Sequence, residues 1–222
     1  MNTSSESIQK SEMRLAILIL AAGEGSRMGG LPKALLKKDG DSLLRRLLQS
    51  IQVLNPVETV VVTGFYGDEI AAEINAVKKQ MDYPLLVVKN PCPELGQSSS
   101  VRLGLESLKS EYDLLLIALC DQPNIGALEI QALLMQFHEL TSQANAVQKI
   151  VLPMVNGVRG NPVLFSREVI KEILAIPGMV CRPYMDQHPE LVNIFATENQ
   201  SYVLDVDTLA DIQKLGLDSI SR

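Results

Sequence analysis

The sequence predicts an α/β fold, with an open, mostly parallel, Rossmann-like sheet and helices on both faces. Short uninterrupted runs of Val, Ile and Leu alternate with longer amphipathic segments. Continuous apolar runs are typical of strands that are covered on both faces. Repeated alternation of strand and helix implies right-handed crossovers, which place successive strands parallel in one sheet.

The first part of the chain contains four such apolar runs. They predict strands at residues 15–20, 59–63, 85–88 and 114–119. The segments between them, 42–54, 67–79 and 98–109, carry apolar residues at helical spacing and are predicted to be helices. Ser98 is predicted to be the N-cap of the third helix, because a serine hydroxyl can accept a hydrogen bond from the first turn.

The pattern is looser after about residue 145. It predicts strands at 150–154 and 162–165 joined by a turn at Asn156-Gly157, and a helix from Ser166. Strands at 191–195 and 202–206 and a closing helix at 208–215 follow. We predict a polar tail at residues 1–12 and a single domain over 13–222, with halves at 13–145 and 146–222.

Composition limits the function classes. The chain has 222 residues, of which 46% are hydrophobic, enough for a substantial core. With 4% aromatic residues, no Trp and a net charge of −6, a nucleic-acid partner is not expected. The run at 15–20 is too short to span a membrane. The three cysteines form no paired motif, which predicts neither disulfides nor a zinc site and favours the cytoplasm.

A glycine-rich loop follows the first predicted strand. The segment Leu20-Ala-Ala-Gly-Glu-Gly-Ser-Arg-Met-Gly29 brings flexible backbone and a cation to the carboxyl end of the strand, where open parallel sheets bind ligands. It is not a dinucleotide fingerprint, which needs glycine at Met28, nor a P-loop, because Leu31 follows Gly30. A phosphate-binding loop and a plain strand-to-helix turn both fit the glycines; Arg27 and Lys33 favour the former.

This loop, followed by Pro32-Lys-Ala-Leu-Leu36, resembles the signature of the MobA-like nucleotidyltransferases. Other segments resemble family motifs in the expected order, namely Val62-Thr-Gly64 with Gly67, Gly96-Gln-Ser-Ser-Ser-Val101, Leu119-Cys-Asp-Gln-Pro123, Gly160-Asn-Pro-Val-Leu-Phe165 and Leu204-Asp-Val-Asp-Thr208. Within the family, the chain is most similar to the molybdenum cofactor cytidylyltransferases. The resemblance implies that residues 13–145 bind the nucleotide and residues 146–222 bind the acceptor.

The resemblance also implies a reaction. A cytidylyl group would pass from CTP to the phosphate of molybdopterin, giving the cytosine dinucleotide cofactor and pyrophosphate. A molybdoenzyme of the xanthine dehydrogenase type would receive the product. Ala22 and Pro32 stand where guanylyl-transferring relatives have Gly and Asp, which favours CTP over GTP.

Carboxylates at predicted strand ends suggest where Mg²⁺ binds, since this ion prefers a few carboxylates plus phosphate oxygens and water. Asp121 follows the fourth strand, although it could instead begin a turn before Pro123. Asp205 and Asp207 lie two residues apart at a predicted strand end and point roughly the same way. By resemblance Asp207 is the second metal ligand, ahead of Asp205; alternatively, Asp207 is an N-cap for the closing helix.

The resemblance assigns three sets of residues. Catalysis is assigned to Arg27, Lys33 and Asp121. Nucleotide binding is assigned to Leu20, Ala21, Ala22, Gly23, Gly25, Ser26, Arg27, Lys33, Gly64, Gln97, Ser98 and Ser99. Acceptor binding is assigned to Gly160, Asn161 and Pro162, where Asn161 replaces the usual His and cannot titrate as His does.

Two other functions remain open at this point. One is a related nucleotidyltransferase that uses GTP or a sugar or polyol phosphate acceptor. The other is a non-catalytic chaperone that delivers cofactor to a molybdoenzyme. Retention of Arg27, Lys33, Asp121 and Asp207 favours an enzyme over the chaperone.

Overall fold

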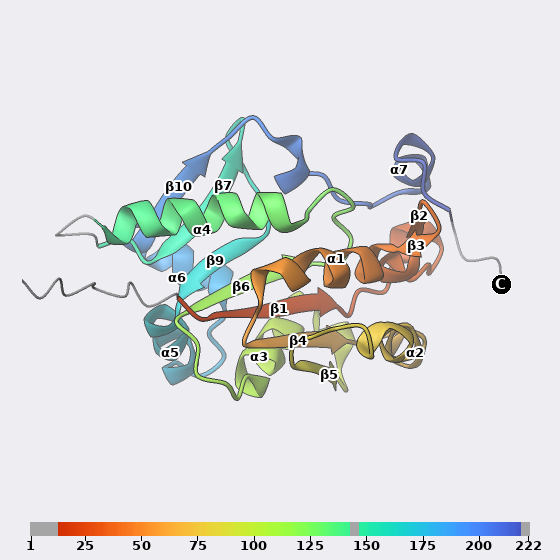
Figure 1. The fold of residues 1–222 in the computed structure, drawn as a ribbon, viewed down its shortest axis with the longest axis horizontal. Coiled ribbons are helices and arrows are strands. Elements are labelled where there is room, and N and C mark those ends of the chain that lie inside the picture. The colour runs from red at the N-terminus through yellow and green to blue at the C-terminus, as the bar shows by residue number, and fades with distance from the viewer. Residues whose placement is uncertain (1–12, 143–146, 219–222) are drawn as a thin grey trace, which may run out of the picture.

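The computed structural model describes residues 13–142 and 147–218, so the tail predicted at residues 1–12 lies outside the described residues. One eight-stranded sheet runs through the molecule (Figure 1). Across the sheet the strands are β10 (Val192–Ala196), β7 (Ile150–Val155), β9 (Val163–Ser166), β6 (Leu114–Leu119), β1 (Leu15–Ala21), β4 (Glu58–Thr63) and β5 (Leu85–Lys89), with β8 (Val158–Arg159) paired to β7. Strands from both predicted halves therefore belong to the same sheet.

The sheet is mostly parallel, as predicted. β1 lies between β4 and β6 and is parallel to both, β5 is parallel to β4, and β10 is parallel to β7. The exceptions are β9, which is antiparallel to both β6 and β7, and the short β8. The carboxyl ends of β5, β4, β1 and β6 consequently lie in a row at one edge, where ligands bind in open α/β sheets.

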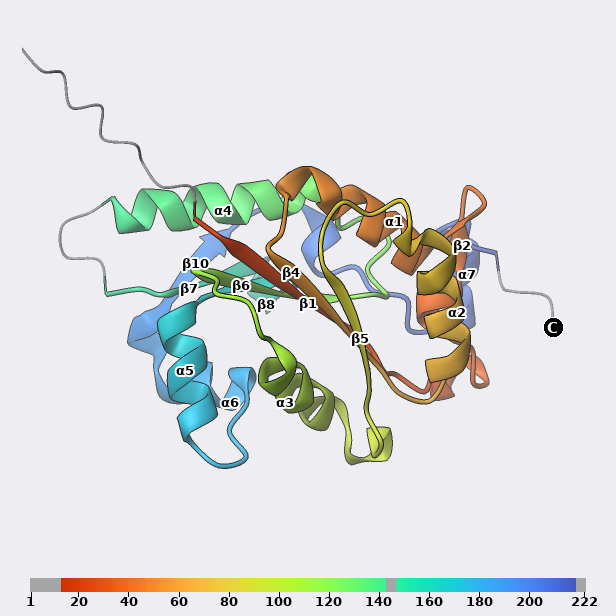
Figure 2. The same ribbon diagram turned by 60° about the horizontal axis from the view of Figure 1, so that its bottom comes forward.

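Helices cover both faces of the sheet (Figure 2). On one face lie α1 (Leu43–Ile51), α2 (Gly67–Lys78) and α4 (Ala127–Thr141), and on the other lie α3 (Gln97–Ser107), α5 (Arg167–Ala175) and α6 (Cys181–Gln187). Side chains of β1 alternate between the two cores: Ile17 and Ile19 pack under the first group, Leu18 under the second. Because both faces are buried, the strand reads as one continuous apolar run.

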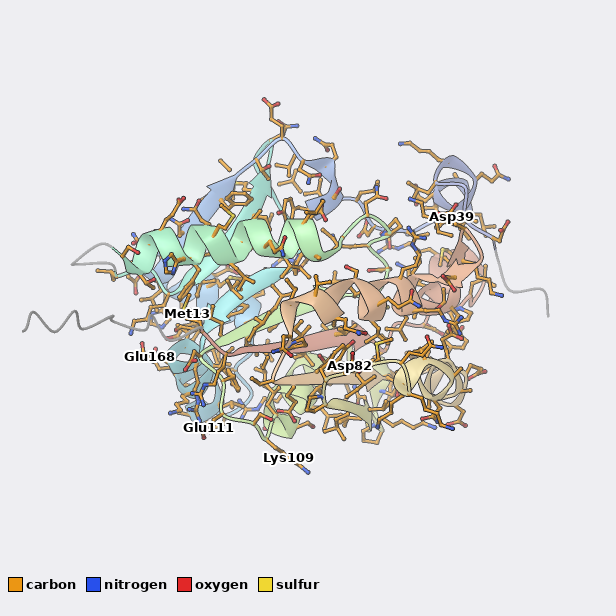
Figure 3. All side chains as sticks on the ribbon, viewed as in Figure 1. Met13, Asp39, Asp82, Lys109, Glu111 and Glu168 are labelled. Carbon is orange, nitrogen blue, oxygen red and sulfur yellow. The ribbon has the colours of Figure 1, made fainter. Side chains whose placement is uncertain are left out.

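A third, smaller cluster joins the closing segment to the glycine loop. Met28 of the loop packs with Val206, Ile212 and Leu217, around the short helix α7 (Leu209–Lys214). Beside it lies a hairpin of β2 (Lys37–Lys38) and β3 (Asp41–Ser42). Figure 3 shows Asp39 of this hairpin at the end of the molecule toward which β1 points, and Met13 at the opposite end.

Several predicted elements differ from the structure. Residues 202–206 do not form a strand: a 3₁₀ turn, η6 (Gln200–Tyr202), precedes irregular backbone. The Asn156-Gly157 turn joins β7 to β8 rather than to β9. The sequence pattern also did not predict α6, β8 or the hairpin of β2 and β3. These elements are two to seven residues long, too short to show a clear hydrophobic period.

Two helix starts are corrected. Helix α3 begins at Gln97 with Gly96 as N-cap and no side-chain cap, so Ser98 lies inside the first turn and is not the cap. Helix α7 is capped by Thr208, whose hydroxyl accepts from the Asp211 N–H, so Asp207 is not the cap either. Within the described ranges, no helix combines the length and apolar character that crossing a membrane requires.

Candidate active site

The glycine loop leaves β1 and turns back on itself. The Met28 and Gly30 N–H groups donate to the Gly25 carbonyl at 2.9 and 3.1 Å. Gly25 has a φ of 66°, in the left-handed region, and a Cβ there would lie 2.1 Å from the Leu31 carbonyl oxygen. No other residue fits this position, so Gly25 is required by the turn itself.

Four charged side chains meet beside the loop. Lys33 Nζ donates to Asp121 Oδ2 at 3.1 Å and to Asp207 Oδ1 at 2.6 Å. Arg27 Nη1 donates to the other oxygen of Asp207 at 2.5 Å. The Lys33 side chain is 18% exposed and that of Arg27 is 71% exposed, so Lys33 is the inner cation and Arg27 the outer one. The three residues predicted to be catalytic, with Asp207, therefore form one cluster.

Backbone contacts bring these distant segments together. Asp121 follows β6, the neighbour of β1, so its position next to the loop follows from strand order. The Val206 N–H donates to the Asp121 carbonyl at 3.1 Å, which places Asp207 beside Asp121. The side chain of Val206 is fully buried, so the segment Asp205-Val206-Asp207 is held by packing as well as by this hydrogen bond.

The charges of the cluster reinforce one another. Burial of Lys33 opposes its charge, but Asp121 and Asp207 outweigh that effect and raise the pKa of the ammonium above its ordinary value. The hydrogen bond from Lys33 lowers the pKa of Asp207, and Arg27 adds to this. Both shifts favour the ionised forms of Lys33 and Asp207.

Asp205 differs from Asp207. Partial loss of water, together with the negative charges of Asp207 and Asp121, raises the pKa of Asp205. Lys33 donates hydrogen bonds to Asp121 and Asp207. On Asp205 it acts only through its charge, which slightly opposes the rise in pKa. Of the two aspartates, Asp207 is the one that shares Lys33 with Asp121.

A cavity of about 350 Å³ lies over the carboxyl ends of β1, β4, β5 and β6. The residues that line it include Leu20, Ala21, Ala22, Gly23, Glu24, Pro32, Lys33, Phe65, Tyr66, Pro93, Glu94, Gly96, Gln97, Ser100, Cys120 and Asp121. All four predicted nucleotide-binding residues before position 24 are among them, together with Lys33 and Gln97. Gly25, Ser26 and Arg27 lie just outside, in the part of the loop that shapes the turn.

The three serines at the start of α3 have separate places. Ser98 lines a second cavity, and the Ser99 hydroxyl donates to the Gly96 carbonyl at 2.8 Å and receives a hydrogen bond from Asn90. Ser100, which the sequence did not single out, lines the first cavity and is buried against the Asn90 amide at 2.9 Å. Neighbouring positions of a helix point in different directions, so the different surroundings of the three serines could be predicted only from the true helix start at Gln97.

The Cys120 thiol also lines the first cavity. It is buried, and burial together with the negative charge of Asp121 raises its pKa. A thiol that stays protonated is a poor nucleophile, so Cys120 packs the floor of the cavity rather than reacting.

The second cavity, also about 350 Å³, adjoins the first and shares Leu20, Gln97 and Leu119 with it. Gly160 and Asn161 line it, whereas Pro162 does not. The Asn161 N–H donates to the Tyr202 carbonyl at 2.8 Å, and a Cβ on Gly160 would lie 2.7 Å from that same oxygen. The structure thus contains two adjoining cavities, one on each side of Leu20.

The chemistry of the carboxylates fits a metal that arrives with a phosphate. Across the part of the chain that the structure describes, no group of three or more His, Cys, Asp or Glu side chains is arranged to hold a metal ion. Mg²⁺ is commonly bound through one or two carboxylates, with the remaining positions taken by phosphate oxygens and water. Asp121 and Asp207 supply such a pair.

Comparison with known families agrees with this geometry. The family model described as "MobA-like NTP transferase domain" matches residues 17–190, most of the chain. The chain belongs to this family. It is therefore a nucleotidyltransferase, and the predicted family and fold class are confirmed.

The individual proteins that the chain resembles have different names and lengths. The chain is 27% identical to a nicotine blue oxidoreductase from Paenarthrobacter nicotinovorans, over 89% of this chain and 94% of the relative. It is 31% identical to the bifunctional protein GlmU of Mycobacterium marinum over 64% of this chain, but that match spans only 29% of GlmU.

Solved structures share the fold. A 4-diphosphocytidyl-2C-methyl-D-erythritol synthase from Anaerococcus prevotii superposes with a TM-score of 0.67, at 15% identity, over 91% of this chain and 94% of the other. Rv0371c of Mycobacterium tuberculosis, in a complex with manganese, gives a TM-score of 0.60 at 20% identity, over 91% and 97%. At these identities the likeness shows the fold alone.

Proposed function

We propose that this nucleotidyltransferase transfers a cytidylyl group from CTP to the terminal phosphate of molybdopterin. The observation that carries the proposal is the cluster of Lys33, Asp121, Asp207 and Arg27 at the first cavity, with a second cavity adjoining it. Residues 13–145 would bind the triphosphate in the first cavity. Gly160 and Asn161, from 146–222, would contact the acceptor in the second.

The proposed reaction needs no general base on the protein. A phosphate monoester is largely ionised at neutral pH, because its second pKa is about 6. One of its oxygens attacks the α-phosphorus of CTP, a new P–O bond forms, and the bond to the β-phosphate oxygen breaks to release pyrophosphate. This agrees with Asn161, an amide that cannot take up the proton.

The protein would contribute position and charge. Lys33 and Arg27 can turn from their carboxylates toward the phosphate oxygens and stabilise the charge that develops there. Asp121 and Asp207 would hold Mg²⁺, which neutralises the triphosphate and orients it for in-line attack. The manganese in a protein of the same fold supports a divalent cation here, although its identity as Mg²⁺ belongs to the proposal.

The nucleobase and the acceptor are tested in one experiment. The protein is incubated with Mg²⁺, each triphosphate in turn and either molybdopterin or a sugar or polyol phosphate, and both acceptor binding and pyrophosphate release are measured. Release with CTP supports the proposal, whereas release with GTP alone overturns the cytidylyl assignment. Release only with a sugar or polyol phosphate overturns molybdopterin as acceptor, and binding without release would identify a cofactor-delivery chaperone.

Partner and compartment follow from the same proposal. The product would pass to a molybdoenzyme of the xanthine dehydrogenase type, which a pull-down with that enzyme, with and without CTP, tests directly. Cys92, Cys120 and Cys181 are free in the structure, which supports the expectation of a reducing cytoplasm.

A further inference from the structure

The first cavity is built from four strand ends in spatial order. Asp121 follows β6, Ala22 follows β1, Phe65 follows β4, and Glu94 lies in the loop after β5. Neighbouring strands are about 4.8 Å apart, so three spacings separate the two ends of this row by roughly 14 Å. If the α-phosphate lies at Lys33 and Asp121, as the proposed function requires, the nucleoside extends along the row toward Glu94.

Gly64, which directly follows β4, lies in the middle of this row of strand ends. A Cβ on Gly64 would lie 2.7 Å from the Ala22 carbonyl oxygen and 2.8 Å from Pro93 Cβ. The loops after β1, β4 and β5 therefore come together at Gly64, which itself has no side chain. A nucleobase can lie over this point with its far edge toward the loop that carries Glu94.

Glu94 is a carboxylate with no partner among the described residues. It is exposed in η4 (Pro93–Leu95), and the structure gives it no hydrogen bond or ion pair to any described residue. The nearby Lys89 is paired with Asp68 at 3.0 Å instead. The Gly96 N–H donates to the Pro93 carbonyl at 3.1 Å, so the turn that carries Glu94 is closed by its own backbone.

We propose that the Glu94 carboxylate accepts a hydrogen bond from the 4-amino group of cytosine and so selects CTP over UTP. An ionised carboxylate can only accept hydrogen bonds. Cytosine presents an N–H donor at this position, and Glu and Asp pair with that amino group in other complexes. Uracil presents a carbonyl oxygen there, so two acceptors would face each other. The assignment rests on the proposed placement of the triphosphate.

The test is equilibrium binding without acceptor. Binding of CTP and of UTP is measured by calorimetry in the presence of Mg²⁺, for the full chain and for Glu94→Gln. The unmodified protein should prefer CTP by on the order of tenfold or more. Glu94→Gln should lose most of this preference, because an amide can turn either its N–H or its C=O toward the base.

Glu24→Gln is the matched control. Glu24 lines the same cavity from the glycine loop, and the substitution removes the same charge. It should leave the ratio of CTP to UTP affinity unchanged. Equal binding of CTP and UTP by the unmodified protein, an unchanged ratio in Glu94→Gln, or an equal loss in Glu24→Gln would each overturn the assignment.

The result separates this inference from the proposed function. CTP preference that depends on Glu94, without pyrophosphate release in the presence of molybdopterin, would leave Glu94 as the selecting residue and disprove the acceptor. Pyrophosphate release with CTP and molybdopterin, together with an unchanged affinity ratio in Glu94→Gln, would support the proposed function and disprove the role of Glu94.

Discussion

Lys33→Met tests whether the inner cation of the cluster is catalytic. Methionine keeps an unbranched apolar chain of similar length, so packing is largely retained while the ammonium is removed. Two hydrogen bonds to carboxylates, at 2.6 and 3.1 Å, are lost. Asp121 and Asp207 then face each other, with Asp205 nearby and only Arg27 to offset their charge.

The magnitude follows from burial. Removing one partner of a fully buried ion pair costs about 3–5 kcal/mol, and an exposed pair contributes about 0–1 kcal/mol. The Lys33 and Asp121 side chains are 18% and 19% exposed and that of Asp207 is 37% exposed, so an intermediate loss of about 2 kcal/mol is expected. For a chain of this size that lowers Tm by roughly 4–8 °C. Pyrophosphate release at saturating CTP should fall on the order of a hundredfold or more, as for other charge contacts to a transition state.

Thermal unfolding, pyrophosphate release and Mn²⁺ binding without nucleotide are the measurements. Arg27→Met is the matched control for stability: its side chain is 71% exposed, and the loss should stay under about 0.5 kcal/mol. Because Lys33 neutralises both carboxylates, Lys33→Met should also bind Mn²⁺ more tightly than the unmodified protein. Near-normal turnover in Lys33→Met would refute its catalytic role, and unchanged Mn²⁺ affinity would refute the competition between Lys33 and a metal.

Three further substitutions test other parts of the site and fold. Asp205→Asn should raise the free energy of unfolding at pH 7, because the folded-state pKa of Asp205 is raised and its ionised form is therefore disfavoured in the native state. The gain should disappear below about pH 4, where the carboxyl is protonated in both states, and urea titrations at several pH values measure it. Gly64→Ala should cost about 1–3 kcal/mol in chemical denaturation and weaken CTP binding, because its Cβ would overlap Ala22; unchanged values would show that the loops can separate freely. Glu58→Ala should cost about 2–4 kcal/mol, because a buried carboxylate oxygen that accepts from the Lys109 and Ser110 N–H groups is lost; Glu58→Gln, which keeps an acceptor, should cost less, and equal losses would point to packing instead.

The sequence predicted the strands near the site well, because β1 and β6 are continuous apolar runs buried along nearly their whole length. β4 is also buried, and β5, although only partly buried at the sheet edge, still shows an unbroken run of Leu and Val. The direction of β9 could not be predicted the same way, since its apolar run has the same pattern in a parallel or an antiparallel strand. The strand predicted at 202–206 was wrong for a different reason. The Tyr202 hydroxyl donates to the Glu129 carbonyl, and its own carbonyl accepts from Asn161 and Gln122, so these groups are satisfied outside any strand ladder.

For the site, the sequence predicted the residues whose position follows from a strand end or a family motif. Lys33 and Asp121 are of this kind. The resemblance ranked Asp207 ahead of Asp205, but the physical reason, the packing of Val206 that brings Asp207 beside Asp121, is one that no spacing rule supplies. Glu94 was not predicted at all, because an exposed acid in a loop carries no local signal until β5 is known to lie beside β4.

The contact between the closing segment and the glycine loop affects when the enzyme becomes active during its synthesis. Residues 17–190, which match the family, contain the loop, Lys33 and Asp121, but Asp207 lies beyond them. Val206 joins Met28 only after this segment has emerged from the ribosome and docked. A nascent chain that has already formed its sheet would therefore still lack the second carboxylate, so the charged cluster is completed only after the sheet.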